Sequence, residues 1–329
     1  MPDPLTSQSV LSLSRNFMES RILLTAAELN LFALLAPWPL TAEEAARRLP
    51  GNLRALTILL DALAAMGFLG KKEGRYQCLP PASHFLSPDR PASVLPMVLH
   101  AAHLWERWSH LTETVGSGPR SFETPHQDEE RLRSFIGAMH AIAAPMASRV
   151  VGMVDPGKAR ALLDVGGASG TYTIAFLLAA PEMKATLFDR PPVIEMARKR
   201  LQEAGMLERT ALVAGDFYSD NLPAGHDLAF LSAIIHQNSP EQNLRLYKKI
   251  FRSLSPGGRI VIRDHIMDPD RTEPLSGAVF AVNMLVATAG GGTYTFAEIA
   301  EDLSRSGFSN IRLLKAGGHM DSLVEAFKD

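Results

Sequence analysis

The sequence predicts an α/β protein in which a mainly helical domain precedes a domain with a seven-stranded, largely parallel sheet. Before Pro156-Gly157 nearly every segment has helical periodicity, whereas after it short apolar runs alternate with amphipathic helices. That alternation is typical of parallel strands joined by crossover helices. A length of 329 residues also suits two domains, each long enough to close a core. We therefore expect domains at residues 1–155 and 156–329.

Composition indicates a globular protein without a strong electrostatic bias. The hydrophobic fraction is 46% and the net charge is -2, so overall charge does not favour a nucleic-acid or anionic-membrane partner. Cys78 is the single cysteine, which excludes an intrachain disulfide and a thiolate-rich metal site. The sequence offers no cluster of Asp and Asn ligands, so we expect no metal.

The first residues, Met1 to Asn16, are polar and lack the basic-then-apolar order of a signal peptide. No uninterrupted apolar run reaches about 18 residues, the length needed to span a membrane. We expect a cytoplasmic protein that does not bind membranes.

The front half has the order helix, turn, helix, hairpin, which is typical of a winged-helix domain. Thr41 and Glu44 form a capping-box pattern that starts a short helix. A second helix follows at 53–66, and Gly74 lies at the centre of a candidate hairpin. These signals predict the fold of the front domain.

Two apolar helices, expected at 15–35 and 53–66, suggest what the front domain binds. They carry more apolar side chains than a solvated domain needs, which predicts a buried homodimer interface. A DNA-binding regulator is the alternative for a winged-helix domain. The helix at 53–66 carries only Arg54 and Asp61 as charges, so we do not expect it to bind DNA.

The back half contains seven candidate strands separated by clear helices. One helix opens at Gly170, one at Pro191-Pro192, and one has Ser239 as its cap with Pro240 in the first position, where proline is favoured. The last two strands fit a hairpin. The expected strands are 161–165, 185–188, 211–213, 227–231, 259–263, 311–315 and 322–327.

A glycine-rich turn follows the first of these strands. The run Asp164-Val165-Gly166-Gly167-Ala168-Ser169-Gly170 has the pattern Asp-x-Gly-x-x-x-Gly. The dinucleotide pattern is Gly-x-Gly-x-x-Gly, so a nicotinamide dehydrogenase is disfavoured. Glycines let the backbone approach a ligand, and the next helix offers free N–H groups. Asp164 suits the ammonium of a methionine moiety and would repel a pyrophosphate. A tight turn without a ligand is the alternative.

Acids also follow the second and third strands. Asp189 lies where an acid hydrogen-bonds ribose hydroxyls in such folds; alternatively it caps the helix that follows. Asp216 can accept from an adenine amino group and Phe217 can pack on the ring; a turn aspartate is again the alternative. All three acids lie at the carboxyl ends of consecutive strands, where open α/β sheets bind ligands. Together they predict S-adenosylmethionine (SAM) as the cofactor.

These residues resemble the small-molecule O-methyltransferases, which include plant caffeate and flavonoid enzymes and bacterial antibiotic-tailoring enzymes. The family loop is Asp-Val-Gly-Gly-Gly-x-Gly, matched here except at Ala168. The resemblance covers most of the chain. It implies a class I Rossmann-like methyltransferase domain and a winged-helix dimerisation domain that closes the neighbour's active site. Ser232 stands at the place of a family lysine that contacts the cofactor. The cofactor-binding candidates are Asp164, Gly166, Gly170, Asp189, Asp216, Phe217 and Ser232.

His236 and Asp264 are the candidate catalytic residues. His236 follows the fourth strand, at the place of the histidine that is the general base in the family. Phenols have a pKa near 10 and imidazoles one near 6.5, so a neutral imidazole can take the proton as the oxygen attacks. Asp264 follows the fifth strand, where the family has a carboxylate that orients the histidine. A surface ion pair with Arg263 is the alternative for Asp264.

The sequence departs from the family around the base. Gln237-Asn238 replaces Asp-Trp, and Thr293 stands for a second family glutamate. Because the family residues that support the base are replaced, S- or C-methylation, or a catalytically silent SAM-binding dimer, remain alternatives to O-methylation.

Three residues fall where the family lines its pocket for the small-molecule acceptor, although the same residue types are common in cores. These substrate-binding candidates are Phe135, Met139 and Met284.

Overall fold

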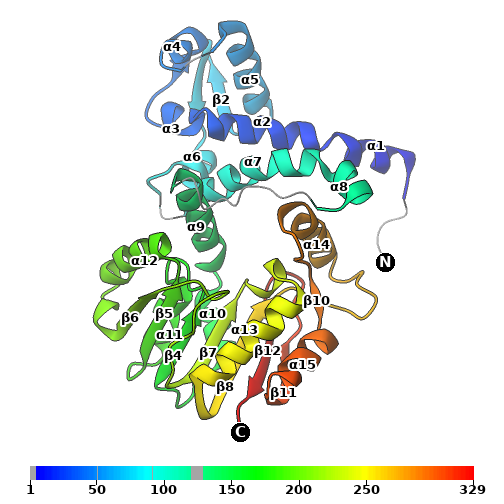
Figure 1. Cartoon of the computed structure of the whole chain (residues 1–329). Helices are drawn as coiled ribbons and strands as arrows, with labels where there is room; N and C mark the ends of the chain where they lie inside the picture. Colours follow the sequence, from blue (N-terminus) through cyan, green and yellow to red (C-terminus); the bar gives the residue numbers. More distant parts are fainter. Residues whose placement is uncertain (1–4, 50, 91, 120–128) are drawn as a thin grey trace. The chain divides into compact units, whose positions relative to one another are not determined.

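The computed structural model describes residues 5–49, 51–90, 92–119 and 129–329 (Figure 1). Its residues fall into two compact units. The first consists of Met1–Glu106 and Asp128–Ala141, and the second of Arg107–Gln127 and Ile142–Asp329. The predicted fold class is confirmed, because the first unit is mainly helical and the second is built on a seven-stranded sheet.

The first unit contains the predicted winged-helix arrangement. Strand β3 (Arg75–Cys78) pairs antiparallel with β1 (Leu40–Thr41) and with β2 (Leu69–Lys72). The capping box of Thr41 starts α4 (Ala42–Ala46), and α5 (Leu53–Ala65) turns Leu60 and Leu63 into the core. The other helices are α1 (Ser7–Arg15), α2 (Phe17–Glu28), α3 (Leu31–Leu35), α6 (Pro80–Leu86), α7 (Leu95–Ser109) and α9 (Glu129–Ala143).

The expected single helix over 15–35 is wrong. The helix α1 ends at Arg15, and the range instead contains α2 and α3, with Asn30 between them in a left-handed conformation at φ +54°. Asparagine tolerates this conformation better than most residues because its short side chain is polar. The apolar periodicity continues across the break, and for this reason the sequence pattern did not reveal it.

The second unit is built on a mixed sheet. Its strands are β4 (Ala161–Val165), β5 (Lys184–Asp189), β6 (Thr210–Ala214), β7 (His226–Ser232), β8 (Leu254–Asp264), β11 (Ser309–Lys315) and β12 (Ser322–Phe327). Their order is β11-β12-β8-β7-β4-β5-β6. The strands from β8 to β6 are parallel, and β12 is antiparallel to both of its neighbours. The carboxyl ends of β4, β5, β6, β7 and β8 therefore share one edge.

Helices cover both faces of this sheet. They are α10 (Ala147–Val154), α11 (Thr171–Ala179), α12 (Pro191–Glu203), α13 (Pro240–Ser253) and α15 (Phe296–Arg305). Two further helices of this unit, α8 (Leu111–Ser117) and α14 (Leu275–Ala287), contact each other, and α14 also contacts the turn after β7. A short parallel pair, β9 (Ile266–Met267) and β10 (Tyr294–Thr295), lies apart from the main sheet. Among the described residues, no single helix has both the length and the apolarity to cross a membrane; one bent pair, Leu132–Ala143 with Ala147–Val154, meets these criteria by length and composition only.

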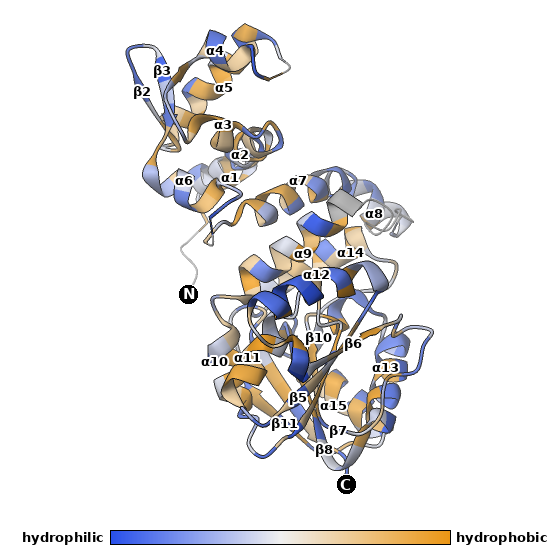
Figure 2. Ribbon diagram, turned by 90° about the vertical axis from the view of Figure 1, so that its left-hand side faces the viewer, coloured by the Kyte–Doolittle hydropathy of each residue, from blue (hydrophilic) through white to orange (hydrophobic). Residues whose placement is uncertain are grey.

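Alternation along the strands divides the core between the two faces. Successive side chains of a strand point to opposite faces, so Leu163 packs with α13 and α15 whereas Leu162 packs with α10 and α11. The helices of the two faces are seen on opposite sides of the sheet in Figure 1, and Figure 2 shows hydrophobic colour over the strands and α11. The two packed layers fix the sheet edge at which the candidate residues gather.

Candidate active site

The glycine-rich loop after β4 has a backbone that only glycine fits well. Gly166 and Gly170 have φ values of +69° and +77°, in the region that favours glycine. A Cβ on Gly166 would lie 2.6 Å from Ile234 Cδ1, and one on Gly167 would lie 2.6 Å from Leu187 Cγ. The loop leads directly into α11, whose first N–H groups lack partners within the helix. This cradle fits a ligand that contacts backbone, as SAM requires.

The side chain of Asp164 is buried under this loop and is not exposed on its surface. The residue is 2% exposed, and the Thr173 hydroxyl donates to its Oδ2 at 2.5 Å. Burial raises the pKa of the Asp164 carboxyl to about 6, against the lowering effect of that hydrogen bond. Because the Asp164 carboxyl is poorly solvated, a cationic partner nearby would stabilise its charged form.

Asp189 connects the tip of β5 to the same loop. Its Oδ2 accepts from the Ala168 N–H at 2.8 Å, and its Oδ1 accepts from the Arg190 N–H at 2.7 Å. Burial raises the pKa of the Asp189 carboxyl, although these two backbone donors lower it. The side chain thus binds the glycine loop rather than the first turn of α12. Asp189 and the loop thus lie together at the carboxyl ends of β4 and β5, and the contact of Asp189 with a ribose stays a prediction.

Asp216 and Phe217 follow β6. Asp216 is exposed, and its Oδ1 accepts from the Tyr218 N–H at 2.9 Å, which forms the local turn that was the alternative interpretation. Phe217 is half-buried against the main core. Its Cε1 lies 3.8 Å from the position of a Cβ on Gly166. The phenyl ring therefore lies next to the glycine loop.

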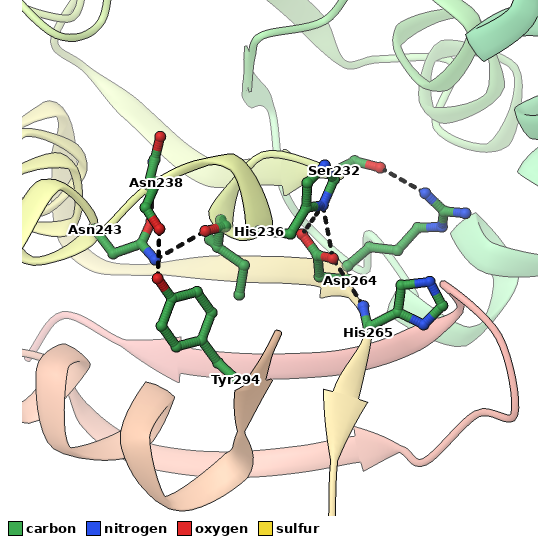
Figure 3. Close-up of polar contacts among 9 residues, drawn as sticks. Ser232, His236, Asn238, Asn243, Asp264, His265 and Tyr294 are labelled. Carbon is green, nitrogen blue, oxygen red and sulfur yellow. Dashed lines mark hydrogen bonds and ion pairs between the residues drawn. The ribbon is translucent and has the colours of Figure 1, made fainter. Parts of the chain in front are cut away.

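His236 and Asp264 are in direct contact (Figure 3). His236 lies in the 3-10 helix η3 (Ile235–Gln237) just after β7, and Asp264 ends β8. The imidazole Nδ1 lies 2.9 Å and 3.0 Å from the two carboxylate oxygens. Their side chains are 12% and 1% exposed. The predicted proximity is confirmed, and the alternative ion pair between Asp264 and Arg263 is wrong, because Arg263 donates to Ser232 instead.

The contact fixes the tautomer of the imidazole. An ionised carboxylate only accepts hydrogen bonds, so in the neutral imidazole Nδ1 is the protonated nitrogen and Nε2 is the one with a free lone pair. Asp264 is held in turn, since its Oδ1 also accepts from the His265 N–H at 2.8 Å. The pair presents a basic nitrogen at the sheet edge where the glycine loop lies.

A buried amide network holds η3 in place. Asn243 Nδ2 donates to the Ile235 carbonyl at 3.0 Å, and Asn238 Nδ2 donates to Asn243 Oδ1 at 2.9 Å. The Tyr294 hydroxyl donates to the Asn238 carbonyl (Figure 3). Sequence reasoning noted Asn238 only as a departure from tryptophan and missed Asn243. The available signal was that Asn243 is a polar residue at a position of α13 that otherwise faces the core.

Backbone from a glycine run supports His236 from another side. The Gly292 N–H donates to the His236 carbonyl at 2.8 Å. A Cβ on Gly291 would lie 2.5 Å from that carbonyl oxygen. Thr293, at the place of the second family glutamate, is buried, and its carbonyl accepts from Arg271 at 2.8 Å. The backbone of Gly291 and Gly292 thus packs against His236, on the side where the family has a supporting glutamate side chain.

Phe280 on α14 is a neighbour of the histidine that sequence reasoning missed. Its ring centroid lies 4.8 Å from that of His236, with the rings at 88°. It also lies 4.9 Å from the ring of His265. In the sequence Phe280 is one of many apolar residues of a helix, so no pattern distinguishes it. The edge-to-face contact restricts the imidazole plane.

The remaining candidates lie on several elements. Met284 is buried on α14 of the second unit. Phe135 and Met139 are half-buried on α9 in the first unit, where Phe135 packs 5.3 Å from the ring of His100. Ser232, the last residue of β7, is half-buried, and its hydroxyl accepts from Arg263 Nη1 at 3.0 Å. Their contacts with ligands remain predictions.

Comparison with known proteins agrees with this architecture. Residues 99–309 match the family model of the O-methyltransferase domain, and residues 11–88 match that of the O-methyltransferase dimerisation domain. The chain is 32% identical to the 3-hydroxy-5-methyl-1-naphthoate 3-O-methyltransferase of Streptomyces sahachiroi, over 92% of this chain and 90% of that one. It is 31% identical to the tetracenomycin polyketide synthesis 8-O-methyl transferase of Streptomyces glaucescens, over 94% and 93%. The solved structure of PigF with SAH superposes with a TM-score of 0.90 at 28% identity, covering 98% of this chain and all of that one.

Proposed function

This chain belongs to the SAM-dependent O-methyltransferase family, and on that premise we propose that it methylates a phenolic hydroxyl of a small aromatic molecule with His236 as the general base. The observation that carries this proposal is the contact between His236 Nδ1 and Asp264 at 2.9 Å. It leaves the other imidazole nitrogen basic at the edge of the sheet that carries the glycine loop. The same pair gives no reason for a catalytically silent dimer.

We assign the cofactor contacts to the loop and to the acids beside it. SAM, when bound, supplies a methyl group on a positively charged sulfur. Asp189 holds the ribose hydroxyls, since an ionised acceptor forms charge-assisted hydrogen bonds. Asp216 accepts from the adenine amino group, and Phe217 packs on the adenine ring. Asp164 faces the ammonium, and the glycines at Gly166 and Gly170 leave room for the ligand beside the backbone.

The proton of the acceptor goes to His236. As the hydroxyl oxygen attacks, Nε2 of the imidazole accepts its proton, and Asp264 stabilises the resulting cation through Nδ1. Asp264 is in this sense a positioning residue. Phe280 and the amide network around Asn243 keep the ring in one orientation. Positioning of the acceptor oxygen in line with the methyl group supplies much of the remaining rate.

The relatives suggest the class of acceptor. By their names, the two Streptomyces enzymes methylate a hydroxyl of a naphthoate and position 8 in tetracenomycin synthesis. We propose a hydroxylated aromatic compound of comparable size. The test is transfer of radiolabel from methyl-labelled SAM to a hydroxynaphthoate, to its methoxy analogue and to an aromatic thiol. Label on the hydroxynaphthoate oxygen alone supports the proposal. Label on the methoxy analogue would indicate carbon as the nucleophile, and label on the thiol alone would indicate sulfur; either result overturns the proposal.

We also propose that the protein is a homodimer joined through its first unit. The match to the dimerisation domain covers residues 11–88. Helix α1 has no buried residue within the chain. Leu13 is 74% exposed, and Phe17 and Met18 are each 52% exposed, which is typical of a surface covered by a partner. Multi-angle light scattering at micromolar concentration should give twice the mass of one chain, and the mass of one chain would refute the dimer.

A further inference from the structure

Arg263 is a buried cation for which the described part of the chain provides no anionic partner. The residue is 3% exposed. Its Nη1 donates to Ser232 Oγ at 3.0 Å and its Nη2 lies 3.1 Å from the Met146 sulfur. Its Nε is buried and makes no hydrogen bond to the described residues. A guanidinium stays charged in proteins, and an unpaired buried charge is costly, so this arrangement indicates a missing anion.

The position of Arg263 places that anion at the cofactor edge of the sheet. Arg263 lies near the carboxyl end of β8 and is the register partner of Ser232, the last residue of β7. Because successive side chains alternate, it points to the face opposite Asp264 and contacts Tyr172 rather than His236. Its guanidinium carbon lies 5.3 Å from the centre of the Tyr172 ring. Tyr172 is in the first turn of α11, immediately after the glycine loop.

Tyr172 provides a second buried donor at the same place. It is 7% exposed, and its hydroxyl makes no hydrogen bond to the described residues. Burial is the main cause of the raised pKa of the Tyr172 phenol; the Arg263 charge lowers that pKa, and the charges of Asp164 and Asp321 raise it. Of these two acids, Asp321 pairs with Lys315. The phenol thus lies near the Arg263 cation and near the Asp164 carboxyl. A neutral phenol and a guanidinium are both donors suited to a carboxylate.

The charges at this edge match an α-amino acid. Asp164 on β4 is the acid, and Arg263 on β8 is the base, with strand β7 between them. The methionine moiety of SAM carries an ammonium and a carboxylate on the same carbon. We propose that Arg263 and Tyr172 bind the α-carboxylate of SAM, with Ser232 fixing the guanidinium. This assignment rests on the proposed cofactor site, and it adds two residues to that site.

The test compares two ligands that differ only in the carboxylate. S-adenosylhomocysteine carries it, and decarboxylated S-adenosylhomocysteine keeps the amine and the nucleoside but lacks it. In calorimetry, Arg263→Met should weaken S-adenosylhomocysteine binding by roughly 10- to 100-fold, as expected for hydrogen bonds to a charged group. Binding of the decarboxylated ligand should change by less than about twofold. Equal loss for both ligands, or no loss for either, overturns the proposal.

Arg259→Met is the matched control. Arg259 lies on the same strand but pairs with Glu325 at 2.8 Å, so its loss should not alter the discrimination between the two ligands. Tyr172→Phe is the second variant, which removes one hydroxyl and keeps the ring; it should weaken S-adenosylhomocysteine binding selectively even if the arginine variant fails to fold. If the wild-type protein binds neither ligand, the cofactor site itself is wrong. If the wild type binds both and the Arg263 variant keeps its preference, only the present inference fails.

Discussion

Replacing Asp164 with asparagine tests the electrostatics of the cofactor edge. The carboxamide has nearly the shape of the carboxyl, and its oxygen can still accept from the Thr173 hydroxyl. Close packing leaves little room for rearrangement, since a Cβ on Gly167 would lie 3.1 Å from Asp164 Oδ2. The substitution therefore changes the charge while keeping the volume and the hydrogen bond.

The magnitude follows from the pKa of the Asp164 carboxyl, which is about 6 in the folded chain against a reference value of 3.8. Between these two values the folded state binds more protons than the unfolded state. The free energy of unfolding therefore falls as pH rises through this window and is constant above it. About two pKa units at about 1.4 kcal/mol each correspond to a cost of about 3 kcal/mol at neutral pH.

Urea unfolding of the ligand-free proteins between about pH 4 and about pH 8 measures this cost. We expect Asp164→Asn to raise the free energy of unfolding by up to about 3 kcal/mol at pH 7, and the gain to vanish towards pH 4. The same variant should bind S-adenosylhomocysteine more weakly, because the ammonium loses its counter-charge. A variant that is less stable than wild type at pH 7, or a difference that does not depend on pH, would refute the reasoning.

Three further predictions concern the loop, the turn and the interface. Ala168 has φ +49°, so Ala168→Gly should raise the free energy of unfolding by about 0.5–1 kcal/mol in urea; lower stability would contradict strain there. Asn243→Leu removes the buried amide that holds the turn of His236, and should cost about 2 kcal/mol of stability and reduce turnover; wild-type values of both would show that the network is dispensable. Leu13→Glu should halve the mass in light scattering, whereas the control Leu178→Glu, at a residue 64% exposed in the second unit, should not; an unchanged mass for the first variant would place the interface elsewhere.

The sheet was predictable because its strands are short apolar runs separated by strong helix signals. The strands β4 and β12 have the predicted bounds, 161–165 and 322–327. β8 extends from Leu254 to Asp264, beyond the predicted 259–263. Its first part contains Pro256 and two glycines, which resemble a turn, yet Leu254 pairs with His226 of β7. Tertiary pairing overrides the local preference there.

The candidate site was predictable where it depends on strand order alone. His236 and Asp264 follow neighbouring parallel strands, and their contact follows from that topology. Phe280 and Asn243 were not predictable, because their contacts come from the packing of α14 and α13 on the turn. The burial of Arg263 was not predictable either, since a single sequence does not reveal which charged residue of a strand end is covered by helices; from the sequence, Arg263 was expected only in the alternative surface ion pair with Asp264.

The most direct test of the account is single-turnover methyl transfer to the best phenolic acceptor, measured across pH for wild type and His236→Ala. If the imidazole removes the acceptor proton, the variant should be slower by roughly 10²- to 10⁴-fold. Its affinity for SAM should hardly change, since in the proposed mechanism the ring contacts the acceptor and not the nucleoside. Asp264→Asn should lose less, because the histidine remains in a poorly fixed tautomer. A His236→Ala variant that keeps more than about a tenth of the wild-type rate would contradict general-base catalysis by this residue.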